Sequence, residues 1–122
     1  MQLVVLDTNA AMLPFTDGTD LEDELEGLLG SVQLVVPTPV VLELQQLALG
    51  QSHTGRAAQA ALVLTRDLRA EHSALAGDDG VLDVARRLGA VLLSNDKRLR
   101  NEAKKSGLTV VQSRGHGRLH VA

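Results

Sequence analysis

The chain of 122 residues contains no cysteine, tryptophan or tyrosine and only one phenylalanine. Without cysteine it can form neither a disulfide framework nor a thiolate zinc site, and this composition suits a reducing compartment. With a single aromatic side chain it has little that could stack on exposed bases. Recognition of a nucleic acid by this chain would therefore depend on phosphate contacts and shape.

Long hydrophobic runs are also absent. The apolar run over residues 1–6 ends at Asp7, well short of a signal-peptide core or a membrane span. Hydrophobic residues still make up 44% of the chain, enough for one domain with its own core. No repeat, linker or low-complexity segment divides it. We therefore expect a single domain over residues 1–122, cytoplasmic and without a membrane partner.

The formal net charge of −3 conceals an uneven distribution. Residues 86–122 hold 9 of the 12 basic residues and only 2 of the 15 acidic ones. Such a split can place a positive surface beside a negative cleft, as the binding of a polyanion through metal ions would require. The alternative is ordinary surface charge, because halves of a sequence need not be halves of a structure.

Short β-branched runs alternate with helical patterns along the chain. Strands are predicted at residues 3–6, 32–36, 90–93 and 108–111, with a fifth at 119–121. Helices are predicted from Asp7 or Thr8, over 20–29, from Pro39 to Leu49 with Thr38 as N-cap, from Arg56 to about Glu71, over 79–88 and over 96–106. This alternation predicts an α/β fold of three layers, α/β/α, with a mainly parallel sheet of four to five strands.

Two aspartates follow predicted strands. Asp7 comes directly after the first strand and Asp96 just after the strand at 90–93. Ligands of open parallel sheets bind beyond the carboxyl ends of the strands, so both carboxylates are expected at the same edge. Either residue alone could instead cap a helix. Their coincidence favours a shared site.

Glu43 lies on a predicted helix between Val40 and Leu47, at the border of the stripe expected to face the sheet. A buried carboxylate is costly there unless it is paired, hydrogen-bonded or bound to a cation. We therefore predict a metal partner for Glu43. The alternative is an edge glutamate that turns outward.

Asp78 and Asp79 begin the next predicted helix, where one could cap the backbone and the other project into the cleft. We expect Asp79 to project. Gly80 costs about 1 kcal/mol in helix propensity relative to alanine, which indicates a turn shaped for something besides stability. Asp83 is expected to pair with Arg87 one turn further on, with metal ligation as the lesser alternative.

Oxygen ligands without sulfur or paired histidines favour Mg²⁺ or Mn²⁺ over softer metals. The scattered histidines have no metal-binding spacing and are interpreted as surface residues. Such hard ions bind phosphate oxygens, and in a two-metal site one ion activates a water while the other, about 4 Å away, stabilises the leaving oxygen. The pattern therefore predicts chemistry on a phosphate ester.

Four short motifs occur in order along nearly the whole chain. They are Val4-Val5-Leu6-Asp7-Thr8-Asn9, Val36-Pro37 through Val40 to Glu43-Leu44, Asp78-Asp79 with Val81, Leu82 and Ala85, and Ser94-Asn95-Asp96 followed by Leu99. Each motif alone is weak, but the ordered set resembles the PIN-domain nucleases. Within that family it is similar to the archaeal branch that resembles both VapC-type toxins and the PIN nucleases that process ribosomal RNA.

The resemblance implies a catalytic and metal-binding site for one or two Mg²⁺ or Mn²⁺ ions. Its acidic residues match Asp7, Glu43, Asp79 and Asp96. Relatives often carry a bulkier residue in place of Gly77 and alanine in place of Gly80, so Asp78 stays open as the ligand instead of Asp79. The small polar residues of the family match Thr8, Asn9 and Ser94, which would orient carboxylates, waters or a phosphate; turn formation is the other role of such residues.

The resemblance also implies hydrolysis of single-stranded RNA by metal-activated water, leaving a 5′-phosphate and a 3′-hydroxyl. The candidates for RNA contact are basic residues that follow Asp96 or lie in the tail: Lys97, Arg98, Arg100, Arg114 and Arg118. His116 and His120 lie in the same tail. A basic helix face is often merely solvated, whereas RNA contact through these residues predicts strong salt dependence.

Three classes of function stay open. The leading one is a metal-dependent endoribonuclease, either a VapC-type toxin, which implies an antitoxin protein and a homodimer as partners, or an rRNA-processing factor. The second is a non-catalytic PIN-fold module that binds RNA. The third, a phosphoacceptor receiver domain, is disfavoured because Asp7-Thr8-Asn9 stands where an acidic pair is expected.

Overall fold

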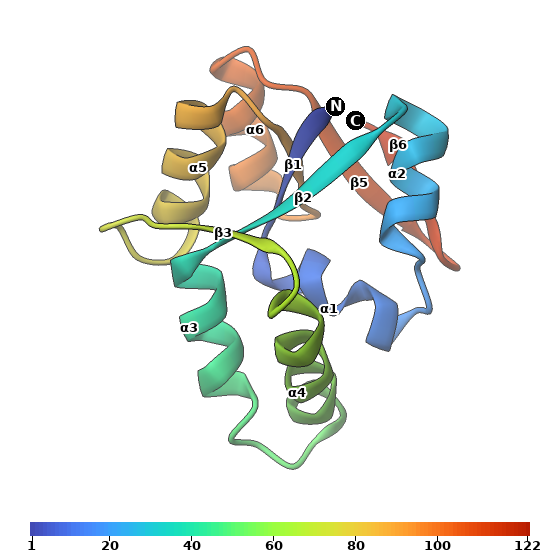
Figure 1. Cartoon of the computed structure of the whole chain (residues 1–122), viewed down its shortest axis with the longest axis vertical. Helices are drawn as coiled ribbons and strands as arrows, with labels where there is room; N and C mark the ends of the chain where they lie inside the picture. The colour runs from blue at the N-terminus through green and yellow to red at the C-terminus, as the bar shows by residue number, and fades with distance from the viewer.

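The computed structural model describes residues 1–122 and is built around one six-stranded sheet (Figure 1). The strands are β1 (Gln2–Leu6), β2 (Val32–Pro37), β3 (Arg69–Glu71), β4 (Val91–Leu93), β5 (Val110–Gly115) and β6 (Arg118–Val121). They are ordered β3-β2-β1-β4-β5-β6. All neighbours pair in parallel except β5 and β6, which form an antiparallel hairpin. The predicted α/β fold with a mainly parallel sheet is confirmed.

Six helices connect and cover the strands. They are α1 (Thr8–Thr16), α2 (Leu21–Leu29), α3 (Thr38–Leu47), α4 (His53–Thr65), α5 (Gly77–Leu88) and α6 (Lys97–Lys105). In Figure 1, α5 and α6 lie on one side of the sheet and α2 on the other, while α1, α3 and α4 gather beyond the carboxyl ends of β1 and β2. None of these helices has the length and apolar character needed to cross a membrane.

The central strands are buried on both faces. Val4, Val5, Leu6, Val35 and Val36 are all at most 1% exposed. This burial explains their continuous apolar runs, because a parallel strand covered by helices on both sides has no face left for polar residues. The core therefore holds the ends of β1, β2 and β4 at one rigid edge, from which the chain turns into α1, α3 and α6.

The sheet has one strand more than the sequence predicts, because β3 forms where the sequence predicts the end of a helix. Helix α4 stops at Thr65, and Arg69–Glu71 then pairs with β2. Arg, Ala and Glu are good helix formers, so pairing with the open edge of β2 overrides local propensity here.

Thr38 was predicted as the N-cap of α3 but is its first residue, with Pro37 at the cap position. Its hydroxyl group instead joins the loop after β3. The Ser73 N–H donates to Thr38 Oγ1 at 3.1 Å, and Thr38 Oγ1 donates to the Ser73 carbonyl at 3.4 Å. The loop leading to α5 is thereby tied to the start of α3.

Gly80 is a point of close contact between α5 and its surroundings. A Cβ atom there would lie 2.4 Å from the Leu75 carbonyl oxygen and 2.5 Å from Pro39 Cγ. We expect Gly80→Ala to lower the free energy of unfolding by about 1–3 kcal/mol, measured by urea denaturation, because the helix must move to relieve the clash.

Gly27 provides the matched control for Gly80. It lies in α2, and a Cβ atom there would meet nothing within 4 Å. Gly27→Ala should therefore raise the free energy of unfolding by about 1 kcal/mol through helix propensity alone. A stabilising effect of both substitutions would show that α5 does not need this close approach.

Candidate active site

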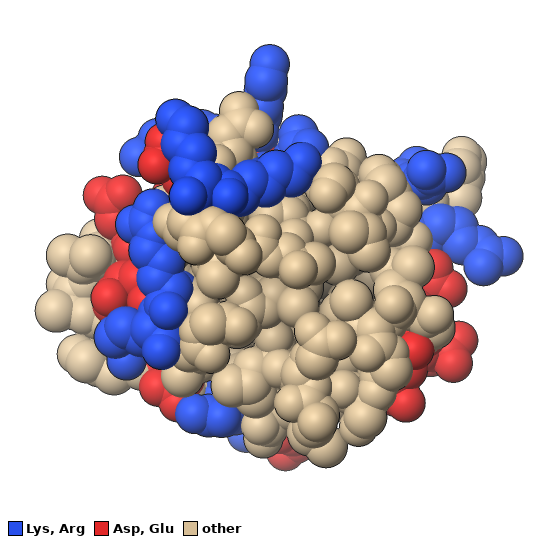
Figure 2. Space-filling model, turned by 90° about the horizontal axis from the view of Figure 1, so that it is seen from above, with Lys and Arg blue, Asp and Glu red and all other residues tan.

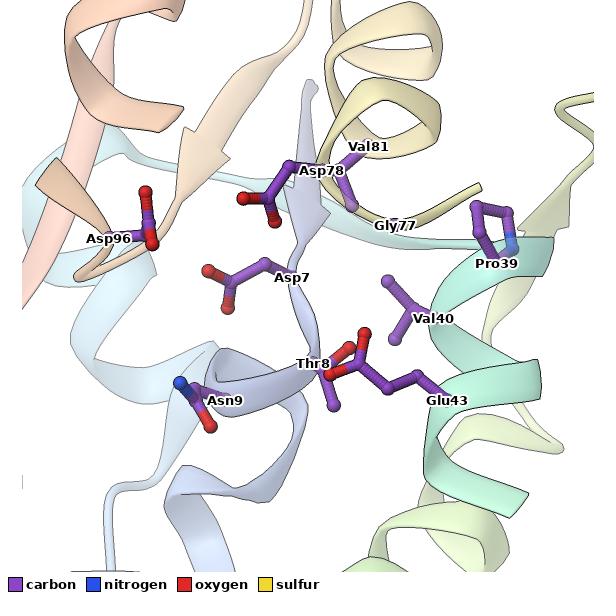
Figure 3. A pocket seen from close by; sticks show the side chains of 10 residues that line it. All are labelled: Asp7, Thr8, Asn9, Pro39, Val40, Glu43, Gly77, Asp78, Val81 and Asp96. Carbon is purple, nitrogen blue, oxygen red and sulfur yellow. The ribbon is translucent and has the colours of Figure 1, made fainter. Parts of the chain in front are cut away.

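An open acidic cleft lies beyond the carboxyl edge of the sheet, between the starts of α1, α3, α5 and α6 (Figure 3). Its lining residues are Asp7, Thr8, Asn9, Pro39, Val40, Glu43, Gly77, Asp78, Val81 and Asp96. The structure thus brings together four carboxylates from four separate segments. Figure 3 shows Asp7, Asp78 and Asp96 close together on one side, with Glu43 reaching in from α3 beside Thr8.

Asp7 is the buried centre of this cleft, with 6% of its surface exposed. It is also the N-cap of α1, because the Ala10 N–H donates to Asp7 Oδ1 at 2.8 Å. Burial raises its pKa from 3.8 to about 6; hydrogen bonds from the Ser94 side chain and the Ala10 N–H oppose the shift, and the nearby Asp78 and Asp96 add to it. Capping and participation in the cleft, which the sequence presented as alternatives, occur together in this residue.

The raised pKa of Asp7 predicts an unusual pH dependence of stability. The folded protein holds this proton more tightly than the unfolded chain does, so the free energy of unfolding should fall as pH rises from 3.8 to about 6 and stay lower above that. The loss amounts to at most about 3 kcal/mol. Urea denaturation of wild type and Asp7→Asn without divalent ions tests this. The difference in free energy of unfolding between the two proteins should change with pH over this range. A pH-independent difference would contradict the prediction.

Asp96 is held by a tight turn at the end of β4. Its Oδ1 accepts the Leu99 N–H at 2.8 Å and so caps α6, while its own N–H donates to Ser94 Oγ at 3.0 Å. Asn95 fastens the turn to β5, because its Oδ1 accepts the Ser113 N–H at 2.8 Å. This role of Asn95 is not predictable from the Ser94-Asn95-Asp96 motif, because it depends on the pairing of β4 with β5.

The register of β1 and β4 explains why Asp7 and Ser94 meet. Leu6 pairs with Leu93, so the residues that follow them, Asp7 and Ser94, lie next to each other at the ends of the two strands. Ser94 is 1% exposed and lies within reach of both Asp7 and the Asp96 backbone. Of the other predicted small polar residues, Thr8 and Asn9 line the cleft directly.

Asp78, and not Asp79, lines the cleft. Burial raises the pKa of Asp78, the nearby Asp96 adds to the shift, and Arg98 opposes it. The Asp79 side chain is 67% exposed and lies on the outer surface beside Asp83. The prediction that Asp79 projects into the cleft is therefore wrong, and Asp78 projects there instead.

Neither aspartate caps α5, contrary to expectation. The helix begins two residues earlier than predicted, at Gly77, and its N-cap is Ala76, which has no side-chain hydrogen bond. Successive helical residues point about 100° apart, and of this pair it is Asp78 that lines the cleft. Asp83 forms the expected pair with Arg87, with Asp83 Oδ1 and Arg87 Nε 3.4 Å apart.

Glu43 lines the cleft but is exposed. The prediction that Glu43 is a buried carboxylate is therefore wrong, although Glu43 does face the cleft. The buried positions of α3 are Pro39, Val40 and Leu44. Glu43 stands just outside this stripe, where a carboxylate needs no partner to be tolerated.

The cleft is chemically suited to Mg²⁺ or Mn²⁺. Its donors are all oxygens, and the closeness of Asp78 and Asp96 to buried Asp7 is a clustering of negative charge that a bound cation would relieve. No three His, Asp or Glu side chains are grouped closely enough to bind one ion jointly. This arrangement fits Mg²⁺, which keeps several waters and commonly takes only one or two carboxylates directly.

The predicted RNA-contact residues have unequal freedom to bind. Arg98 lies within ion-pair distance of Asp78 and Asp79, Arg100 donates to Gln112, and Arg118 pairs with Glu24. Lys97 and Arg114 are exposed and form no ion pair. Figure 2 shows Lys and Arg side chains gathered along one side of the molecule, the side on which α5 and α6 lie in Figure 1.

Comparison with known proteins identifies a family that the chain matches. Residues 4–116 match the family described as PIN like domain. Ribonuclease VapC9 of Archaeoglobus fulgidus is 27% identical over 111 residues, which cover 90% of this chain and 82% of that protein. This alignment makes the two proteins distant relatives.

Two solved structures share the fold. The PIN domain endonuclease Utp24 superposes with a TM-score of 0.77 at 22% identity, over 98% of this chain and 90% of that one. VapBC2 from Rickettsia felis, bound to a DNA fragment from its promoter, gives a TM-score of 0.63 at 18% identity, over 92% and 99% of the two chains. With the family match covering nearly its whole length, the chain belongs to the PIN-like domain family.

Proposed function

We propose that this protein is a Mg²⁺- or Mn²⁺-dependent endoribonuclease that hydrolyses phosphodiester bonds of single-stranded RNA. The observation that carries the proposal is the convergence of Asp7, Glu43, Asp78 and Asp96 in one cleft of a PIN-like fold. The distant relationship to a VapC ribonuclease and the fold shared with a PIN endonuclease support this class of reaction.

Asp7, Asp78 and Asp96 are the proposed metal-binding residues, of which one or two would contact the ion directly and the remainder would act through its bound waters. When bound, the metal supplies a water of lowered pKa and a positive charge against the leaving oxygen. Asp7 and Asp96 each accept a helix N–H through Oδ1, which fixes the orientation of the carboxylate. The pKa of Asp7, about 6, leaves this group mostly ionised at neutral pH.

Glu43 has a different position and therefore a different proposed role. It approaches from α3, next to Thr8 and apart from the three aspartates (Figure 3). Being exposed, it can accept a proton from the attacking water or support a second ion without a large desolvation cost. Water adds to phosphorus, the bond to the 3′ oxygen breaks, and that oxygen takes a proton; the products carry a 5′-phosphate and a 3′-hydroxyl.

The biological setting is proposed along two lines. The relationship to VapC9 and the fold shared with VapBC2 favour a toxin, with an antitoxin protein and a second copy of the chain as partners. The fold shared with Utp24 keeps RNA processing as the alternative. A small antitoxin-like reading frame beside the gene would favour the toxin.

A non-catalytic RNA-binding module is the second candidate. The absence of a tight group of three ligands is the observation that favours it. Calorimetric titration with Mn²⁺ separates the two, because a degenerate site would bind no stoichiometric metal.

The activity test uses wild-type protein and a mixture of single-stranded RNAs. We expect cleavage with Mg²⁺ or Mn²⁺, loss of cleavage with excess chelator, and recovery when Mn²⁺ is restored. The new 5′ ends should become available to a kinase only after phosphatase treatment. Cleavage unaffected by chelator, or no cleavage with either ion, would overturn the proposal.

A further inference from the structure

Arg98 bridges the inside and the outside of the cleft. It stands in the first turn of α6, with Nη1 3.8 Å from Asp78 Oδ2 and Nη2 3.6 Å from Asp79 Oδ1. Asp78 lines the cleft, whereas Asp79 lies outside it. One guanidinium group thus contacts a proposed metal ligand inside the cleft and a neighbouring carboxylate outside it.

Arg98 partly neutralises the metal-free cleft. Arg98 is the basic side chain within ion-pair distance of Asp78, which lines the cleft. A divalent cation bound to Asp78 would lie close to the Arg98 guanidinium group and repel it, because both are positively charged. Arg98 and the cation therefore compete for this carboxylate.

The other basic residues near the cleft lack this double contact. Lys97, the preceding residue, forms no ion pair, and Arg100 is turned toward Gln112 on β5. Arg98 is also suited to a phosphate ligand, because its planar fork can donate two parallel hydrogen bonds. Its side chain is 64% exposed and so is free to move away from Asp78.

We propose that Arg98 exchanges partners when the site fills: it pairs with Asp78 in the metal-free cleft and, once a divalent cation takes Asp78, remains held by Asp79 and binds a phosphate of the RNA. This inference rests on the proposed function, since it assumes a metal at Asp78. It assigns Asp79 the role of a positioning residue for Arg98.

Mn²⁺ binding without RNA tests the competition directly. Isothermal calorimetry at 0.15 M salt compares wild type, Arg98→Gln and the control Lys104→Gln, an exposed lysine six residues further along α6 that forms no ion pair. Arg98→Gln should bind Mn²⁺ about two- to fivefold more tightly, the range expected for loss of an exposed charge pair. Lys104→Gln should match wild type because its charge is screened.

The same variant has the opposite effect on RNA. Arg98→Gln should raise the KM for a single-stranded RNA by about three- to tenfold, the loss expected when one hydrogen-bonded phosphate contact is removed, while lowering the Mn²⁺ concentration that gives half-maximal cleavage. An unchanged or weaker Mn²⁺ affinity overturns the exchange, and so does an unchanged KM. If wild type binds no Mn²⁺, the proposed function fails as well, whereas normal wild-type binding with no difference in Arg98→Gln refutes only this inference.

Discussion

Asp7→Asn is expected to reduce RNA cleavage by on the order of 10²-fold or more while making the protein more stable at pH 7. The loss of activity follows because an amide cannot supply the negative charge that the proposed metal requires. Even partners that only orient metal ligands contribute about 10–100-fold, so a direct ligand should contribute at least as much.

The gain in stability has a separate cause. Asparagine is as good an N-cap as aspartate, so the contact with the Ala10 N–H should survive. The substitution removes a buried charge whose pKa has been raised from 3.8 to about 6, which corresponds to at most about 3 kcal/mol. Wild type retains a charge that costs stability, as expected where a helix-capping carboxylate also serves the proposed metal site.

Asp20→Asn is the matched control for this experiment. Asp20 caps α2 in the same way, with its Oδ1 accepting the Asp23 N–H at 3.1 Å, but it is exposed and does not line the cleft. This control should change neither cleavage nor the free energy of unfolding appreciably. Initial rates on labelled RNA and urea denaturation measure the two effects. Near-normal cleavage by Asp7→Asn would exclude the carboxylate mechanism.

The residues that sequence reasoning located well are those positioned by topology alone. Asp7 and Asp96 follow parallel strands, and any parallel sheet would bring them to one edge. The buried runs of β1 and β2 were equally predictable, because their burial on both faces leaves a continuous apolar pattern.

The residues whose positions are predicted wrongly are those that depend on tertiary packing. Arg69–Glu71 has helical propensity but forms a strand because β2 offers an unpaired edge. Glu43 faces the cleft for a reason unrelated to burial, since it is exposed. The position of α5 is fixed where Gly80 meets Pro39, and no local pattern along the chain reveals that contact.

Asp78→Asn and Asp79→Asn form a matched pair of variants that tests which of the two side chains α5 directs toward the cleft. Both substitutions remove one negative charge from the first turn of the same helix, so they should have similar effects on helix stability. Only Asp78 lines the cleft and has a pKa raised by burial and by Asp96. Both variants should therefore fold, and the loss of function should follow Asp78→Asn and not Asp79→Asn.

Asp78→Asn should weaken Mn²⁺ binding at least about tenfold and slow cleavage by on the order of 10²-fold, whereas Asp79→Asn should slow it less than about fivefold. Calorimetry and initial rates measured on the same preparations test this difference. Equal damage from both would mean that Asp79 reaches the metal and that α5 is turned by about one residue from its orientation here. Damage from Asp79→Asn alone would reverse the assignment, because a helix that offers one residue to a cleft must turn its neighbour about 100° away.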